Sequence, residues 1–191
     1  MDSGQHASSG MSRGLKTLVS IVIMVLFVVV LSWALRTFVF QPYEIPSGSM
    51  EETIMTGDMV FSEKVTYYFR EPEAGDIVTF ADPQVPSRTL IKRVIATEGQ
   101  TVDLQNGQVV VNGVALSEPY TEGKPSYPLD RNAAGITVTF PYTVPQGYVW
   151  VMGDNRTNSQ DSRYFGAVPA SSITGRAAVI YWPLNDIGVL S

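Results

Sequence analysis

The residues with the clearest chemical potential begin with a serine in a short loop. Ser49 lies within Pro46-Ser47-Gly48-Ser49-Met50, directly after a flexible glycine and three residues after a fixed proline. A loop of this kind can present a hydroxyl that becomes a nucleophile once a base removes its proton. The same composition is typical of an ordinary linker leaving a helix. The role of Ser49 therefore depends on whether the chain supplies a base.

Histidine and cysteine cannot supply that base. The sequence holds one histidine, His6, in a Ser/Gly-rich N-terminal stretch, and it holds no cysteine. This excludes a Ser-His-Asp triad, a thiolate nucleophile and a multi-histidine or cysteine-held metal site within the sequence. No cofactor is expected. If Ser49 is a nucleophile, its base must be a lysine or a carboxylate.

Four lysines are available, and one of them differs from the others in its neighbours. Lys16 precedes a long apolar run, Lys64 follows a glutamate in a polar segment, and Lys124 lies in a Pro/Gly-rich stretch. Lys92 stands instead among apolar residues with strand-like alternation. Lys92 is therefore the strongest candidate for a base.

The strand expected at Thr89–Ala96 sets the environment of Lys92. Alternation places Leu90, Lys92, Val94 and Ala96 on one face. Partial desolvation there disfavours the charged amine and lowers its pKa, as a base working near neutral pH requires. An edge-strand lysine that extends its amine to water is the alternative.

A polar loop after a later apolar segment is the third unusual stretch. Residues 153–163 combine paired charges with asparagines and serines. A solvated turn held by local side-chain bonds is one interpretation. A functional loop would instead use Asp–Arg pairs to fix its shape and a hydroxyl to orient a catalytic amine. The residues concerned are Asp154, Arg156, Ser159, Asp161 and Arg163.

An apolar run near the N-terminus predicts a membrane anchor. Leu18–Leu35 would span roughly 27 Å as a helix, close to the ~30 Å hydrocarbon core of a bilayer. We expect a disordered tail at 1–16, an anchor at 17–40 and an extracytoplasmic domain at 41–191. Basic residues before the run favour a cytoplasmic N-terminus. A cleaved signal peptide is the alternative, since Ser32-Trp33-Ala34 resembles a small-x-small cleavage site, although the run is longer than usual.

The remainder predicts a mainly β fold. Short alternating segments are separated by turn signals, including two Asn-Gly pairs that favour hairpins. Residues 117–135 lack periodicity and predict a long surface loop, and residues 60–69 are ambiguous between helix and strand. The pattern indicates an antiparallel sandwich or barrel-like fold. The expected strands are Asp76–Phe80, Thr89–Ala96, Thr101–Leu104, Gln108–Val111, Val114–Leu116, Thr137–Tyr142, Tyr148–Met152 and Arg176–Trp182.

The charge balance argues against a nucleic-acid partner. The formal net charge is -5 at pH 7, and the acidic excess is greater still in the part that follows the apolar run. Nucleic-acid binding ordinarily needs a basic face.

Taken together, these stretches resemble the bacterial type I signal peptidases over nearly the whole chain. The resemblance rests on residues 46–50, Gly75-Asp76-Ile77-Val78, Lys92-Arg93 and the loop at 153–163, in that order behind an N-terminal apolar run. It implies a membrane-anchored serine endopeptidase that removes signal peptides from secretory preproteins. Cleavage would follow small residues at positions −1 and −3 of the substrate. The expected location is the plasma membrane, with one span, the lipid bilayer as partner and the secretion translocon as a candidate partner.

The resemblance also implies roles for individual residues. Ser49 would be the nucleophile and Lys92 the general base, with Ser47 and the Ser49 amide forming the oxyanion hole. Ser159 would orient the lysine amine. The resemblance further implies a mainly antiparallel fold with a small cap region near residues 99–145. Its implied supports of the loop are the ion pair Asp161–Arg163, together with Asp154 and Arg156.

One position departs from the family pattern. The family commonly has proline shortly after the Ser-Met pair, where this chain has Glu52. Proline would fix φ and stiffen the segment behind the nucleophile. We therefore expect a less rigid segment here, and the two carboxylates Glu51 and Glu52 would favour a charged lysine if they faced it.

Two other functions remain open from the sequence. The chain could be a catalytically silent, membrane-anchored binding module of the same fold. It could also be another Ser/Lys acyl-transfer enzyme, although Ser-x-x-Lys is absent and no DNA-binding segment is visible. A peptide-cleavage assay separates these possibilities.

Overall fold

The structure, a computed structural model, describes residues 12–190. It divides into two compact units, with the boundary between Phe38 and Val39. The first unit holds helix α1, Arg13–Phe38, which has no buried residue and is long and apolar enough to cross a membrane. Helix α1 begins at Arg13, so residues 13–16, which were expected in the tail, are helical. The remainder of the predicted tail, residues 1–11, lies outside the described residues.

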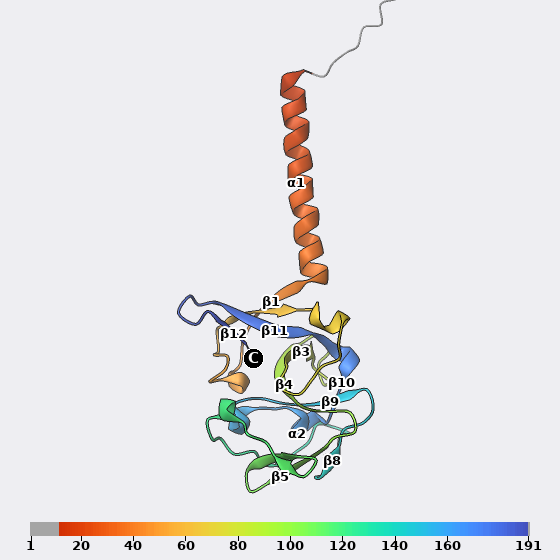
Figure 1. The fold of residues 1–191 in the computed structure, drawn as a ribbon, viewed down its shortest axis with the longest axis vertical. Helices are drawn as coiled ribbons and strands as arrows, with labels where there is room; N and C mark the ends of the chain where they lie inside the picture. The colour runs from red at the N-terminus through yellow and green to blue at the C-terminus, as the bar shows by residue number, and fades with distance from the viewer. Residues whose placement is uncertain (1–11, 191) are drawn as a thin grey trace, which may run out of the picture. The chain divides into compact units, whose positions relative to one another are not determined.

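The second unit is built on an eight-stranded antiparallel sheet, which confirms the predicted mainly β fold (Figure 1). Its order is β1-β2-β11-β3-β4-β9-β10, with β12 pairing β11 at the side. The strands are β1 (Phe40–Glu44), β2 (Met59–Glu63), β3 (Ile77–Ala81), β4 (Thr89–Thr97), β9 (Tyr148–Met152), β10 (Val168–Pro169), β11 (Ile173–Trp182) and β12 (Gly188–Val189).

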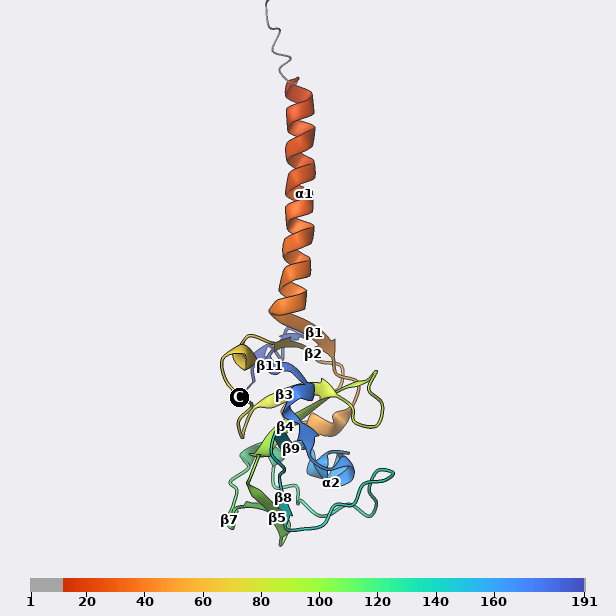
Figure 2. The ribbon, with the colours of Figure 1, turned by 90° about the vertical axis from the view of Figure 1, so that its right-hand side faces the viewer.

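A smaller antiparallel sheet lies at the end of this unit away from β1 (Figures 1 and 2). Its order is β7-β6-β5-β8, and it falls inside the region expected for the cap, residues 99–145. Turns at Asn106-Gly107 and Asn112-Gly113 join its first three strands. Both residues of each turn have positive φ, as the favoured two-residue hairpin turns require. The strands are β5 (Thr101–Gln105), β6 (Gln108–Val111), β7 (Val114–Ala115) and β8 (Tyr142–Thr143).

Short helices complete the unit and bring its loops back onto the sheet. The four-residue helix α2, Ser162–Phe165, is capped by the Asp161 side chain, which accepts from the Arg163 amide. Single 3-10 turns occur at η1 (Gly48–Met50), η2 (Thr66–Tyr68), η3 (Pro119–Thr121), η4 (Arg156–Asn158) and η5 (Ala170–Ser172). The ambiguity at residues 60–69 resolves into the end of β2 followed by η2.

Trp150 on β9 joins the two sheets. Its ring is fully buried and contacts Phe140 and Tyr142, whose ring centroids lie 5.7 and 4.7 Å away. The predicted strand at Thr137–Tyr142 is wrong for most of its length, because β8 begins only at Tyr142. Phe140 packs on Trp150, and Pro141 has no N–H to donate to a ladder.

A bulge in β4 changes the predicted face of that strand. The pairing of β4 with β9 shifts between Val94 and Ala96. Leu90 and Val94 pack in one core cluster, whereas Ala96 joins Ile95 in another. The prediction that Ala96 shares the face of Lys92 is therefore wrong, because one extra residue at a bulge rotates the following side chains.

Candidate active site

Ser49 lies in η1, on a segment that the core holds in place. Met50 and Ile54 after it are fully buried, and Ile45 before it is 3% exposed. The Ser49 side chain is itself buried, at 7% exposure. Buried apolar neighbours on both sides fix the backbone of a loop that composition alone would suit to a flexible linker.

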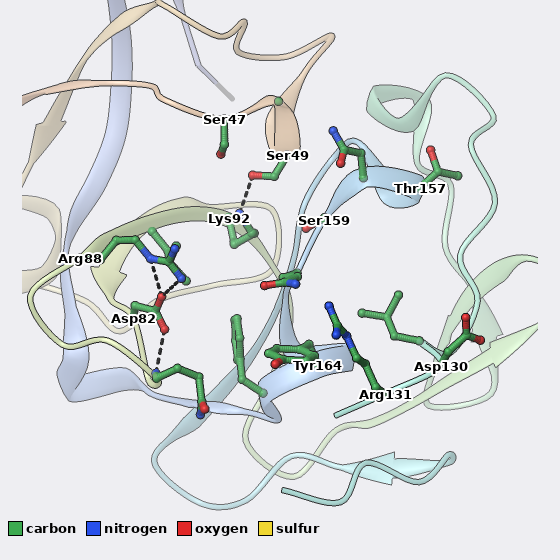
Figure 3. Close-up of a pocket in the computed structure, with 17 residues that line it drawn as sticks. Ser47, Ser49, Asp82, Arg88, Lys92, Asp130, Arg131, Thr157, Ser159 and Tyr164 are labelled. Carbon is green, nitrogen blue, oxygen red and sulfur yellow. Dashed lines mark hydrogen bonds and ion pairs between the residues drawn. The ribbon is translucent and has the colours of Figure 1, made fainter. Parts of the chain in front are cut away.

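Lys92 contacts Ser49 directly. Its Nζ donates to Ser49 Oγ at 2.6 Å and to the Ile91 carbonyl oxygen at 2.8 Å (Figure 3). Lys92 is 3% exposed, and burial lowers its pKa from 10.5 to about 8. The alternative of an amine extended to water is therefore wrong. An amine with this pKa is neutral in a useful fraction near pH 8 and can accept the proton of a bonded hydroxyl.

Two carboxylates near the Lys92 amine raise its pKa, but their effect is smaller than the lowering caused by burial. The charges of Asp161 and Asp154 favour the protonated amine, but desolvation is the larger effect on the pKa of Lys92. Burial raises the pKa of Asp161, while hydrogen bonds and the charge of Arg163 lower it more, so its pKa lies below the ordinary value. Asp161 is therefore ionised at neutral pH and stabilises the lysinium that proton transfer would produce.

The loop at residues 153–163 is braced by its own ion pair. Arg163 Nε and Nη2 each donate to Asp161 at 2.9 Å, and both side chains are almost fully buried. Asp161 Oδ2 also accepts from the Gly153 amide at 3.1 Å. Arg163 Nη2 donates further to the Arg156 carbonyl oxygen at 2.8 Å. These contacts close the loop on itself beside Lys92.

Asp154 and Arg156 support the loop through partners elsewhere in the chain. Arg93 donates to both carboxylate oxygens of Asp154, at 2.9 and 2.8 Å, and Thr53 donates to Asp154 at 2.6 Å. Arg156 instead donates to Glu118 through two nitrogens, at 2.8 and 2.6 Å. Asp154 thus ties the loop to β4 and to the segment after Ser49, whereas Arg156 ties it to the segment at residues 117–135.

Ser159 and Ser47 occupy the same cavity without a bond to Lys92. Ser159 Oγ is buried, and no hydrogen bond joins it to the lysine amine in residues 12–190. The Ser47 side chain points into the cavity beside Ser49 (Figure 3). The backbone at Ser47 is extended, with φ −141° and ψ 149°.

Two further residues shape the backbone at Ser49 and were missed in the sequence. The Asn155 amide donates to the Ser49 carbonyl oxygen at 3.1 Å, and Asn155 Nδ2 donates to the Gly48 carbonyl oxygen at 2.9 Å. A Cβ atom at Gly153 would lie 2.3 Å from the Ser49 carbonyl oxygen, so only glycine fits there. The only signal in the sequence was their place in the polar loop, with Asn155 between two charged residues and Gly153 directly before the first of them.

The carboxylates at Glu51 and Glu52 do not face Lys92. Glu51 accepts from Thr56 and from Asn155 Nδ2, and Glu52 pairs with Lys124 at 3.2 Å. The φ of Glu52 is 79°, a conformation that the proline ring cannot adopt. The expected loss of rigidity is offset by the buried contacts around Met50 and Asp154, and the local backbone differs from what proline would impose.

The serine–lysine pair opens onto a cavity of about 770 Å³. This volume is within the usual range of ligand clefts. The cavity is bounded by the β3–β4 hairpin, the loop at 153–163 and the segment at 117–135. Among residues 12–190 no group of three or more His, Cys, Asp or Glu side chains could hold a metal ion. A mainly antiparallel β fold that buries a hydroxyl against a lysine of lowered pKa has the parts of a serine hydrolase that uses lysine as its base.

Comparison with known proteins shows which family of hydrolases this chain belongs to. Residues 16–182 match the family described as signal peptidase, peptidase S26. Signal peptidase I of Leptolyngbya laminosa is 40% identical over 85% of this chain and 78% of its own length. Probable signal peptidase I-1 of Synechocystis is 39% identical over 87% of this chain and 84% of its own length. A crystal structure of a signal peptidase I from Enterococcus faecalis is 34% identical, with a TM-score of 0.46 over 56% of this chain and 97% of that chain. The chain belongs to the signal peptidase family, peptidase S26, and is a peptidase.

The buried pair Asp161–Arg163 yields a prediction for stability. Arg163→Ala leaves an unpaired carboxylate in the interior, which we expect to cost about 3–5 kcal/mol and to lower Tm by roughly 6–20 °C. Thermal unfolding followed by tryptophan fluorescence measures the change. Lys124→Ala is the matched control, because it removes the partly exposed pair with Glu52 and should cost less than about 1 kcal/mol. Equal Tm values for the two variants would contradict the bracing role.

Proposed function

We propose that this peptidase removes N-terminal signal peptides from secreted preproteins as a membrane-anchored serine endopeptidase. Ser49 is the nucleophile and Lys92 the general base. The observation that carries the proposal is the 2.6 Å hydrogen bond between Lys92 Nζ and Ser49 Oγ at a buried site. The lowered pKa of Lys92 supports it, because a fully charged amine could not accept the hydroxyl proton.

The chemistry proceeds in two halves. Neutral Lys92 takes the Ser49 proton as the oxygen attacks the scissile carbonyl carbon, and the Ser49 amide and Ser47 hydroxyl stabilise the oxyanion. The lysinium then protonates the leaving amine as the peptide bond breaks. In the second half Lys92 activates a water that hydrolyses the acyl-enzyme. A rotation of the Ser159 hydroxyl toward the amine would orient Lys92 through the cycle.

The substrate adds to the free edge of β4. Strand β9 pairs with β4 from Arg93 to Thr97, which leaves Thr89–Lys92 without a partner on that side among the described residues. An extended peptide can form ladder hydrogen bonds with such an edge. Alternate side chains of an extended peptide face the same way, so a shallow cavity wall would require small residues at both −1 and −3.

Helix α1 anchors the enzyme in the plasma membrane in this proposal. Arg13 and Lys16 at its start favour a cytoplasmic N-terminus, which places residues 41–191 on the extracytoplasmic face. The lipid bilayer is then a partner, and the secretion translocon is a candidate one, because preproteins emerge from it on that face. The formal net charge of -5 at pH 7 argues against nucleic acid as a partner.

The pH dependence of cleavage tests the proposed base. The neutral fraction of an amine with a pKa of about 8 rises about tenfold between pH 7 and pH 9. Because the neutral form is the base, kcat/KM should rise about tenfold over this range and fall as pH drops through 8. The assay uses the full chain in detergent and a secretory preprotein, with the cleavage position read by mass spectrometry.

Two results would contradict this proposal. A profile that is flat from pH 6 to 9, or that rises only near pH 10.5, would remove Lys92 as a base of lowered pKa. Cleavage after bulky residues would remove the proposed specificity. Tryptophan fluorescence recorded at each pH is the control, since it shows that the fold is constant over the range.

A further inference from the structure

The cavity extends past the serine–lysine pair to a second wall that the sequence did not predict. Residues 117–135, expected to be a surface loop, contribute Leu129, Asp130 and Arg131 to its lining. Figure 3 shows Ser49 and Lys92 between two ends of the cavity. One end carries Arg88 and Asp82 of the β3–β4 hairpin, and the other carries the second wall.

Hydrogen bonds fix the second wall to the catalytic loop. Arg163 Nη1 donates to the Tyr127 carbonyl oxygen at 3.2 Å, and Asn132 Nδ2 donates to the Arg163 carbonyl oxygen at 3.0 Å. The Ala133 amide donates to the Tyr164 carbonyl oxygen at 2.9 Å. These bonds flank Asp130 and Arg131 on both sides. The wall is therefore held at a defined position relative to the nucleophile.

A second set of contacts, from Arg156 and Arg93, holds the first part of residues 117–135 in place. Arg156 is almost fully buried and donates to Glu118 through two nitrogens and to Ser126 Oγ at 2.7 Å. The Tyr120 ring lies beneath Arg93, whose guanidinium carbon is 4.0 Å from the ring centroid. Buried bidentate contacts of this kind restrict movement strongly. The wall behaves as part of the binding surface.

The two arginines of the cavity differ in how their charge is used. Arg88 is bonded to Asp82, so its charge is neutralised within the hairpin. Arg131 makes no hydrogen bond or ion pair with any residue in the described part of the chain. Its guanidinium points into the cavity, whereas the Asp130 carboxylate points away (Figure 3). Arg131 thus presents unused donors that match a carboxylate of a bound peptide.

The direction of the substrate decides which residues Arg131 meets. A shared requirement at −1 and −3 implies an extended peptide before the cleaved bond. The free edge Thr89–Lys92 runs from the hairpin end of the cavity to the catalytic pair. The residues before the bond therefore occupy the hairpin end. The residues after the bond leave toward the wall that carries Arg131.

We infer that Arg131 is a specificity-determining residue that recognises the first residues of the mature protein and favours an acidic side chain there. This inference rests on the proposed function, since it uses Ser49 and Lys92 to place the cleaved bond. Arg131 is exposed, so an acidic side chain near it gains a modest charge-assisted contact and a basic one meets repulsion. The enzyme then selects preproteins on both sides of the cleaved bond.

Matched preproteins test the inference. They share one signal peptide and differ only in a single Glu, Gln or Lys at one of the first five positions after the cut. At the position nearest Arg131 we expect kcat/KM to be about fivefold higher for Glu than for Lys, the upper end for a partly exposed ion pair. Arg131→Gln should abolish this ratio and Arg131→Glu should invert it. The ratio should shrink with added salt.

Lys124→Glu is the matched control, because it makes the same charge change on the same segment outside this cavity. It should keep the wild-type order of substrates. Equal cleavage of the Glu and Lys preproteins at all five positions would overturn the inference, as would an unchanged order in Arg131→Glu. Cleavage of the Gln preprotein would still support the proposed function in either case. Failure to cleave any preprotein would instead remove the proposed function itself.

Discussion

Ser49→Ala is expected to abolish preprotein cleavage, with a loss of at least roughly 10⁴-fold in kcat, because removal of a nucleophile eliminates the covalent route. Ser47 lies beside it in the cavity but does not receive the hydrogen bond of Lys92. No neighbouring hydroxyl is thus prepared to replace it. The measurement is single-turnover cleavage of a secretory preprotein by the full chain in detergent.

The fold should survive this change, so the loss can be assigned to chemistry. The only side-chain hydrogen bond of Ser49 in residues 12–190 is the one from Lys92. The backbone contacts from Asn155 do not depend on the hydroxyl. Ser171→Ala, at an exposed serine of η5, is the matched control and should retain full activity. Cleavage by Ser49→Ala above one hundredth of the wild-type rate would contradict the role of nucleophile.

Local sequence patterns predicted strands correctly where the turn residues and the apolar residues both favoured the same strand. Residues 108–111 form a strand whose three valines are buried, and the preceding Asn106-Gly107 turn has the positive φ values that its sequence favours. Thr137–Tyr142 failed because its β-branched and aromatic residues cover Trp150 rather than joining a ladder. Composition does not distinguish these two uses of the same residue types.

At the candidate site, too, the local sequence pattern predicted some residues but not their long-range partners. The chemical need of a serine for a base singled out Lys92, because the sequence offers few bases. The partners of Asp154 and Arg156 could not be predicted, although these residues are two apart. One pairs with Arg93 and the other with Glu118, both distant along the chain. Such pairings depend on how the sheets bring loops together, which local charge patterns do not encode.

The second wall of the cavity is a further case. Residues 117–135 have no periodicity, and a polar stretch rich in proline and glycine predicts a surface loop. Most of its residues are exposed, as expected, but Arg156 and Arg163 reach across from another loop and bond to Glu118 and to the backbone of the segment. A segment without regular structure can thus be ordered by the side chains of its neighbours.

Lys92→Ala is expected to reduce cleavage by at least about 10³-fold, since general-base catalysis contributes roughly 10²–10⁴-fold and no other base in residues 12–190 bonds to Ser49. Lys92→Arg separates the base from the charge. Arginine keeps a positive charge at every accessible pH and has no neutral form to accept a proton. It should therefore be as inactive as the alanine variant, even at pH 9.

Replacing Lys92 with an uncharged residue should remove activity but should not lower the stability of the fold. Burial makes the charged amine unfavourable, as the lowered pKa of Lys92 records, so Lys92→Met should fold with an equal or higher Tm below pH 8. As pH rises above 8 the folded amine becomes neutral before the unfolded one does. The stability of the wild type then increases, and its Tm should approach that of Lys92→Met. A Lys92→Arg variant with more than a tenth of wild-type cleavage, or a Lys92→Met variant that unfolds well below the wild type at pH 7, would show that Lys92 serves structure more than catalysis.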